Sequence, residues 1–160
     1  MKPLAVLSIG CCLFACNSPA LPYREAPAKF FPVHFYVENG SKTQPATDLR
    51  IDWDTTVVAQ DTFRYTGIGD LFDTYSLSAK SGLHRIKVTN NLNKLVRDTT
   101  IQVDTLTHVF ISFTYNKLDA AAVKRIKEQH PPEGEEAVIN ALSMPKHLTI
   151  HIMRGHISIP

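Results

Sequence analysis

The chain has 160 residues, of which 44% are hydrophobic, and its formal net charge is +2, from 17 lysines and arginines against 15 aspartates and glutamates. A chain of this length can bury one sizeable hydrophobic core, so we expect a single domain. The basic residues are scattered and nearly balanced by acidic ones, which gives no electrostatic case for a nucleic-acid partner.

The first fifteen residues have the layout of an export signal. Lys2 supplies the positive charge, and residues 4–15 form an almost unbroken apolar or small run. This run is shorter than the roughly 20 residues that a membrane-spanning helix needs, so a cleaved signal peptide is expected. It ends in Leu13-Phe14-Ala15-Cys16, which resembles a bacterial lipobox, the site where a signal peptidase cuts before a lipid-modified cysteine. The alternative is an ordinary secretory signal with a chance cysteine.

The resemblance to a lipobox implies a lipid anchor, such as palmitate, on Cys16. All three cysteines (Cys11, Cys12 and Cys16) lie in this segment, so the cleaved chain could form no internal disulfide. Two or three acyl chains anchor a protein stably, at about 0.8 kcal/mol per buried methylene. Residues 16–30 contain three prolines and are expected to form a tether. No acidic run follows Cys16, which favours the periplasmic face of the outer membrane.

Residues 31–160 are expected to form the folded domain. Several runs alternate apolar and polar residues, the pattern of half-buried strands. The runs expected as strands are 33–38, 49–54, 56–65, 72–77, 83–89, 96–103 and 108–115. The residues expected to face inward are Val33, Phe35, Val37, Leu49, Ile51, Trp53, Ile86, Val88, Val109, Ile111, Phe113 and Tyr115. Short strands at this spacing predict a mainly β fold, a single antiparallel β-sandwich of about seven to eight strands.

The pattern changes after residue 116, where one or two short helices are expected near the C-terminus. Residues 118–129 are rich in helix formers and end before two prolines, and residues 135–142 suggest a second short helix. A last strand is expected over residues 147–153, where Leu148, Ile150 and Ile152 alternate with polar residues. We therefore expect a helical insertion over residues 117–143, with the last strand joining the sandwich beside an early one.

Residues 82–88, Gly-Leu-His-Arg-Ile-Lys-Val, resemble the G-x-H-x-I-x-V pattern of PEGA-type modules. More widely, residues 75–115 are similar to half of the small immunoglobulin-like or transthyretin-like modules of bacterial envelope proteins. The chain departs from the PEGA pattern because no proline-glycine pair precedes the histidine and the module does not repeat. The resemblance implies a surface or interaction role rather than a catalytic one.

The C-terminal segment holds a cluster of soft metal ligands, His147, His151, Met153 and His156, of the type used in periplasmic copper sites. On a strand, His147 and His151 would lie about 13 Å apart at about 3.3 Å per residue, too far for one metal ion. We therefore expect exposed strand histidines, with no metal and no cofactor.

Asp52 and Asp54 are the candidate carboxylate pair. Two residues apart on a strand, they would share a face at about 7 Å, a separation that invites comparison with glycosidase carboxylates. The competing interpretation is a solvated face flanking a buried Trp53. No G-x-S-x-G or H-E-x-x-H motif occurs in the chain, so no catalytic residues are predicted.

Three strand histidines are interpreted as structural. His84 shares the presumed core face, so we expect it to be buried or half-buried with a backbone partner. His34 and His108 are expected on the solvent side of apolar strand faces.

The dipeptide Asp-Thr occurs five times. Around Thr55, Thr99 and Thr105 it resembles the D-[ST]-[small or aliphatic] signal for O-glycosylation of exported proteins in some Gram-negative anaerobes. The competing explanation is strand composition, because threonine is common in strands.

These observations favour a non-enzymatic, lipid-anchored cell-envelope protein that presents a β-sandwich to a protein or glycan partner. The faces that carry His34, Tyr36, Asp52 and Asp54 are the candidate contact surfaces. One alternative is an accessory subunit or enzyme acting on envelope or dietary glycans. Another is a periplasmic metal-binding protein that uses the C-terminal histidine and methionine cluster.

Overall fold

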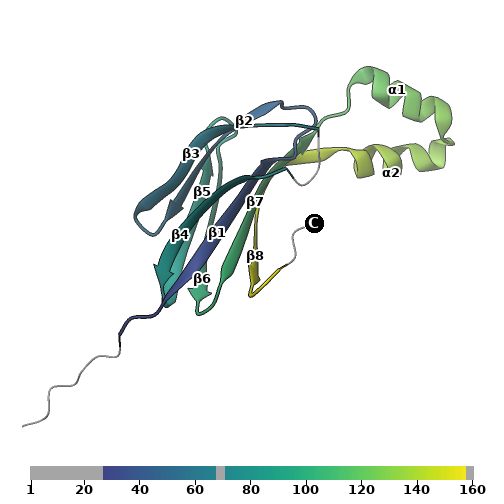
Figure 1. Cartoon of the computed structure of the whole chain (residues 1–160). Coiled ribbons are helices and arrows are strands. Elements are labelled where there is room, and N and C mark those ends of the chain that lie inside the picture. The colour runs from purple at the N-terminus through teal and green to yellow at the C-terminus, as the bar shows by residue number, and fades with distance from the viewer. Residues whose placement is uncertain (1–26, 68–70, 158–160) are drawn as a thin grey trace, which may run out of the picture.

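A computed structural model describes residues 27–67 and 71–157 of the chain (Figure 1). The expected export signal, the expected acylation site Cys16 and most of the expected tether lie outside the described residues.

The described residues form eight strands and two helices. The strands are β1 (Phe30–Asn39), β2 (Ala46–Trp53), β3 (Thr56–Arg64), β4 (Asp73–Lys80), β5 (Gly82–Asn90), β6 (Leu95–Val103), β7 (Thr107–Asn116) and β8 (Met144–Arg154). The helices, α1 (Ala120–Gln129) and α2 (Pro132–Leu142), lie between β7 and β8. The mainly β fold with two short helices near the C-terminus confirms the prediction.

The strands form two four-stranded sheets that pack face to face. The first sheet has the order β4-β1-β7-β8 and the second has the order β3-β2-β5-β6. Five of the six strand pairs are antiparallel, but β1 and β7 run parallel, with Val33 opposite Thr107 and Asn39 opposite Phe113. The expectation of a purely antiparallel sandwich was therefore wrong for the central pair of the first sheet.

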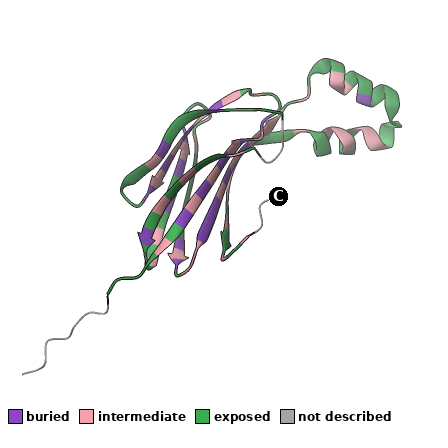
Figure 2. Cartoon of the chain, in the orientation of Figure 1, coloured by how far each residue is buried: buried purple, intermediate pink, exposed green. Residues whose placement is uncertain are grey.

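The core lies between the sheets and follows the predicted alternation. Along β1, Val33, Phe35 and Val37 are fully buried, and the same period of two appears on β2 and at the end of β5 (Figure 2). The ring of Phe35 meets the indole of Trp53 edge-on, with centroids 5.8 Å apart, so the two sheets are joined by an aromatic contact. Burial of each such side chain stabilises the fold by about 1.5–3 kcal/mol.

The last strand joins the first sheet at its edge. Leu148 is buried and Ile150 and Ile152 are partly buried, as the alternation predicted. The neighbour of β8 is β7, with Ile111 opposite Ile150, so the expectation that β8 would lie beside an early strand was wrong. The two helices bridge β7 and β8 and form the connection that lets these strands pair as antiparallel neighbours.

The two helices project as a hairpin from one end of the sandwich (Figure 1). The Asp119 carboxylate caps α1 by accepting the Ala122 backbone N–H at 2.6 Å, and α2 begins with Pro132 in its first turn. Within the described helices Ile126 alone is buried. In the part of the chain that the structure describes, neither helix is long and apolar enough to span a bilayer.

Candidate functional site

The outward face of the first sheet carries aromatic and imidazole side chains. The solvent side of a strand in a two-layer sandwich normally carries polar residues. Here β1 and β7 place His34, Tyr36, His108 and Phe110 on that side, and Phe72, directly before β4, leans against them. We call these five side chains the ring cluster.

Parallel pairing of β1 with β7 brings the rings into stacks. It sets His34 opposite His108 and Tyr36 opposite Phe110. The rings of Tyr36 and Phe110 stack with centroids 4.7 Å apart and planes 14° apart, and those of His34 and His108 stack at 5.6 Å and 29°. Phe72 lies nearly perpendicular to both Tyr36 and Phe110. Each aromatic pair contributes about 0.5–1.5 kcal/mol beyond its burial.

His108 fixes the ring cluster to the end of β8. Its Nε2 lies 3.1 Å from the Gly155 carbonyl oxygen, which can only accept, so Nε2 carries the proton and donates it. Its Nδ1 then accepts from the Tyr36 hydroxyl at 3.1 Å. Burial lowers the pKa of His108, and the nearby His34 and His156 lower it further, against the opposing effect of the Gly155 bond. The ring is therefore held neutral.

The expected position of His108 was only half correct. It lies on the outward face, yet it is 5% exposed. The neighbouring rings of His34 and Tyr36 and the chain at Gly155 cover it. Alternation assigns a side chain to a face of a sheet but does not say what covers that face.

A hollow lies beside the ring cluster, between β1 and β4. It has a volume of about 260 Å³ and is lined by His34, Tyr36, Thr74, Tyr75 and Ser76. We call it the β4 ledge, because small side chains of β4 form a step beside the taller rings of β1.

His84 is half-buried with a backbone partner, as expected. Its Nε2 lies 2.7 Å from the Lys80 carbonyl oxygen and its Nδ1 lies 2.8 Å from the Asp54 carboxylate. Its ring also stacks on the indole of Trp53, with centroids 4.8 Å apart. Both partners of the two ring nitrogens are acceptors, so the ring must donate from both, which describes an imidazolium.

The pKa values in this cluster agree with an imidazolium–carboxylate pair. Burial alone lowers the pKa of His84, but the bonds to Asp54 and Lys80 and the charge of Asp54 outweigh it, so the pKa is raised. For Asp54, burial raises the pKa, but the Arg85 backbone N–H and the His84 imidazolium outweigh it, so the pKa is lowered. The arrangement braces the turn between β2 and β3 against the start of β5.

Asp52 and Asp54 do not form a carboxylate pair on one strand face. β2 ends at Trp53, and Asp54 has a φ of 53°, which takes it out of the strand alternation. Asp52 pairs with Arg50 at 2.9 Å, whereas Asp54 pairs with His84. The two carboxylates therefore have separate partners, and the glycosidase comparison gains no support.

The histidines and methionine of β8 are spread along the strand. His151 lies opposite Phe110 and Met153 lies opposite His108, while His147 lines a different hollow. Within residues 27–67 and 71–157, no group of three or more histidine, cysteine, aspartate or glutamate side chains is placed to hold a metal ion.

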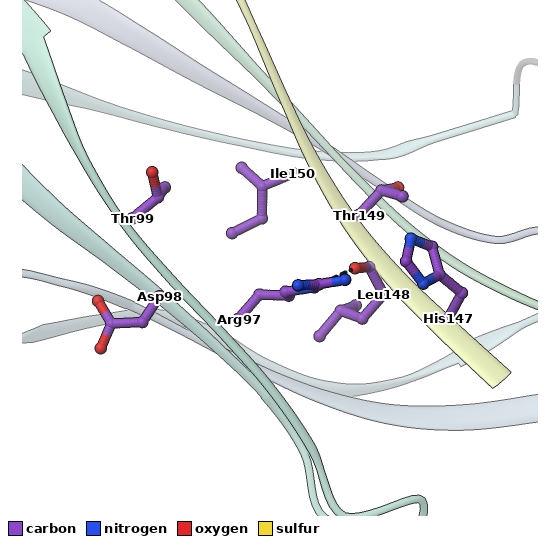
Figure 3. A pocket seen from close by; sticks show the side chains of 7 residues that line it. All are labelled: Arg97, Asp98, Thr99, His147, Leu148, Thr149 and Ile150. Carbon is purple, nitrogen blue, oxygen red and sulfur yellow. Dashed lines mark hydrogen bonds between the residues drawn. The ribbon is translucent and has the colours of Figure 1, made fainter.

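The hollow beside His147 lies between the edge strands β6 and β8 and measures about 330 Å³ (Figure 3). Arg97 crosses it, and its Nε donates to the Leu148 carbonyl oxygen at 2.9 Å. Asp98 points away from the hollow in Figure 3 and pairs with Arg85. Arg97 lies on β6 of the second sheet and Leu148 on β8 of the first, so this hydrogen bond links the edge strands of the two sheets.

The three threonines of the Asp-Thr pattern differ in exposure. Thr55 is exposed in the turn between β2 and β3, whereas Thr99 lines the hollow between β6 and β8 and Thr105 is half-buried between β6 and β7. Of the three, Thr55 is the most accessible to a modifying enzyme.

The chain matched no protein-family model, no curated protein and no solved structure. The resemblance of residues 75–115 to PEGA-type and immunoglobulin-like modules therefore rests on the sequence alone.

Phe72, His108 and Phe110 were not identified as site residues from the sequence. A signal was present, because His108 and Phe110 alternate with the core residues Val109 and Ile111. The parallel partner strand that stacks them could not be deduced from that run.

Proposed function

We propose that the chain is a non-enzymatic, lipid-anchored cell-envelope protein that uses the ring cluster as its interaction surface. The observation that carries this proposal is the stacked set of rings on the outward face of the first sheet. Tyr36 is held by a hydrogen bond to His108 and by stacking on Phe110. A surface that is ordered before binding loses little side-chain entropy when a partner arrives, which favours affinity.

The topology supports one orientation of the domain relative to the proposed anchor. β1 starts at Phe30, and the parallel strands β1 and β7 both end at the opposite end of the sandwich, from which α1 and α2 project (Figure 1). An anchor at Cys16 would therefore join the domain at the end opposite the hairpin, with the ring cluster along the side. Residues 16–29 can extend at most about 50 Å, at roughly 3.5 Å per residue.

The proposed location is the periplasmic face of the outer membrane, and the proposed partner is a protein or a glycan. The PEGA-like pattern at residues 82–88 supports an envelope role by resemblance. Thr55 is the best supported of the three candidate O-glycosylation sites, because its side chain is exposed.

The two alternative functions receive less support from the described residues. A glycan-processing enzyme needs convergent carboxylates in a cleft, and Asp52 and Asp54 are bound to different partners. A metal-binding protein needs converging ligands, and His147 and His151 lie at different places along β8.

Two experiments test the proposal. Intact-mass analysis of the protein from its native membrane is expected to give an N-terminus at Cys16 with added acyl chains, and Cys16→Ser is expected to release the protein from the membrane. A mass that retains the first fifteen residues without acylation would refute the anchor.

The interaction surface is tested by crosslinking in intact cells. Tyr36→Ala is expected to reduce capture of the partner, because it removes the centre of the ring cluster. Tyr65→Ala is the matched control, since Tyr65 is an exposed tyrosine at the end of β3, in the other sheet. Equal capture by both variants would refute the proposed surface.

A further inference from the structure

The β4 ledge exposes one face of each ring on β1. The sheet order is β4-β1-β7, and the rings of His34 and Tyr36 stack across the strands on the β7 side. Their other faces therefore turn toward β4. The described residues directly opposite them on β4 are Ser76 and Thr74, which are small and exposed. Phe72 contacts Tyr36 nearly perpendicular to its plane and does not lie flat on it.

The ledge combines an apolar wall with a hydroxyl floor. The wall is formed by the rings of His34 and Tyr36, and the floor by Thr74 and Ser76. The Tyr75 side chain packs toward the core instead. Serine and threonine hydroxyls both donate and accept hydrogen bonds, and the imidazole of His34 offers a further polar atom. Among the residues that the structure describes, no lysine, arginine, aspartate or glutamate lines the hollow.

A sugar ring has the complementary chemistry. One face of a pyranose presents C–H groups that lie flat on an aromatic ring, and its rim carries hydroxyls that both donate and accept. Small-molecule sites in proteins commonly pair aromatic walls with a few placed polar groups. A lining without an acidic, lysine or arginine side chain among the described residues favours a neutral ligand, because a charge on the ligand would meet no such partner there.

We infer that the β4 ledge binds a sugar ring of a neutral glycan. This inference rests on the proposed interaction role and names its ligand class. A proline-rich peptide is the main competing occupant, since such peptides also dock on aromatic grooves. The floor of two hydroxyls favours the sugar, because the rim of a sugar can bond to both of them and a proline ring has no donor.

The wall is rigid enough to act as a platform. The Tyr36 ring stacks on Phe110 with centroids 4.7 Å apart, and its hydroxyl is hydrogen-bonded to His108. His108 in turn is hydrogen-bonded to the Gly155 carbonyl oxygen. A glycan would therefore meet rings that are already in place.

The test uses the full chain, kept in a detergent without a sugar headgroup. The probes are neutral oligosaccharides of glucose, xylose and mannose, an oligogalacturonate as the charged counterpart, and a proline-rich peptide. Binding is measured by saturation-transfer NMR and by calorimetric titration. We expect at least one neutral oligosaccharide to bind, and Tyr36→Ala to weaken it at least tenfold.

Two further variants keep the result decisive. Ser76→Arg fills the hollow from an exposed position and is expected to abolish binding without lowering the melting temperature. Tyr65→Ala removes an exposed tyrosine elsewhere and is expected to leave binding unchanged.

Three outcomes would overturn the inference: no binding of any neutral oligosaccharide, binding that survives both Tyr36→Ala and Ser76→Arg, or preference for the peptide or the charged sugar. Each of these is distinguishable from failure of the proposed function. If crosslinking still depends on Tyr36 while no glycan binds, the interaction surface stands and the glycan assignment falls.

Discussion

The pair formed by His84 and Asp54 makes a quantitative prediction about pH. Asp54→Asn keeps the size of the side chain, tolerates the φ of 53° and can still accept the Arg85 backbone N–H, which lies 2.9 Å from Asp54. Its amide can donate to Nδ1 of a neutral His84 that keeps its proton on Nε2 for Lys80. The substitution therefore removes the charge pair and leaves the geometry satisfied.

The expected decrease in the free energy of unfolding on Asp54→Asn lies between two limits. A hydrogen bond to a charged group contributes about 1.5–3 kcal/mol when well shielded, and an exposed ion pair contributes about 0.2–1 kcal/mol. The His84 side chain is 13% exposed and that of Asp54 is 43% exposed, so the pair is intermediate. Stacking of the imidazolium on Trp53 adds a cation–π contribution. We expect Asp54→Asn to lower the free energy of unfolding by about 1–2 kcal/mol near neutral pH.

The sign of the pH dependence follows from the two pKa directions. The pKa of His84 is raised above 6.5 in the folded state, so its contribution is complete below 6.5 and is lost as the pH rises through the raised pKa. The pKa of Asp54 is lowered below 3.8, so its contribution is present above 3.8 and is lost as the pH falls through the lowered pKa. The difference between wild type and Asp54→Asn should be largest between these values.

Urea unfolding at about pH 5.5, 7 and 9 measures this difference, because the window is set by the unfolded His pKa of about 6.5 and the raised folded value. The difference should shrink at the highest pH. Asp98→Asn is the control, since Asp98 pairs with Arg85, and an arginine stays charged throughout. Its small effect should not change with pH. A cost for Asp54→Asn that is the same at all three pH values would refute the imidazolium assignment.

Four other changes have expected outcomes. Phe35→Ala should lower the free energy of unfolding by about 3–5 kcal/mol, read from the urea midpoint, because the ring is fully buried. Arg97→Met should cost about 1 kcal/mol and speed amide exchange along β8 but not β1, because it frees the carbonyl of Leu148; unchanged exchange would contradict the edge contact. The pKa of His108 is lowered mainly by burial, so the unfolded chain binds protons first and the free energy of unfolding should fall as the pH drops below 6.5. His108→Phe should make the free energy of unfolding depend less on pH in this range. The same pH dependence in wild type and variant would exclude His108 as its source. Truncation after Asn116 should give an insoluble or less stable product, since it removes β8 from the sheet; an equally stable, soluble product would show that β8 is dispensable.

The strand alternation predicted the core well. Val33, Phe35 and Val37 are buried because side chains on a strand point alternately to its two faces, a rule that needs no knowledge of partners. The helices between β7 and β8 were predicted from local propensity, which is also independent of partners.

Features that depend on distant partners were not predicted. The parallel pairing of His34 with His108 joins residues far apart in sequence, and neither run specifies the other. The ring cluster and the burial of His108 both follow from that pairing. Asp54 was misplaced for a local reason, because its positive φ ends β2 one residue earlier than the alternation suggested.

The central position of β1 has a consequence for how the chain acquires its fold. Of the described strands β1 is synthesised first, yet its neighbours β4 and β7 begin at residues 73 and 107. Closing such long loops is slow, and topologies dominated by distant contacts fold late and slowly. The first sheet cannot assemble until most of the polypeptide has left the ribosome. A nascent chain with this order of events keeps both edges of β1 unpaired until β4 and then β7 have been made.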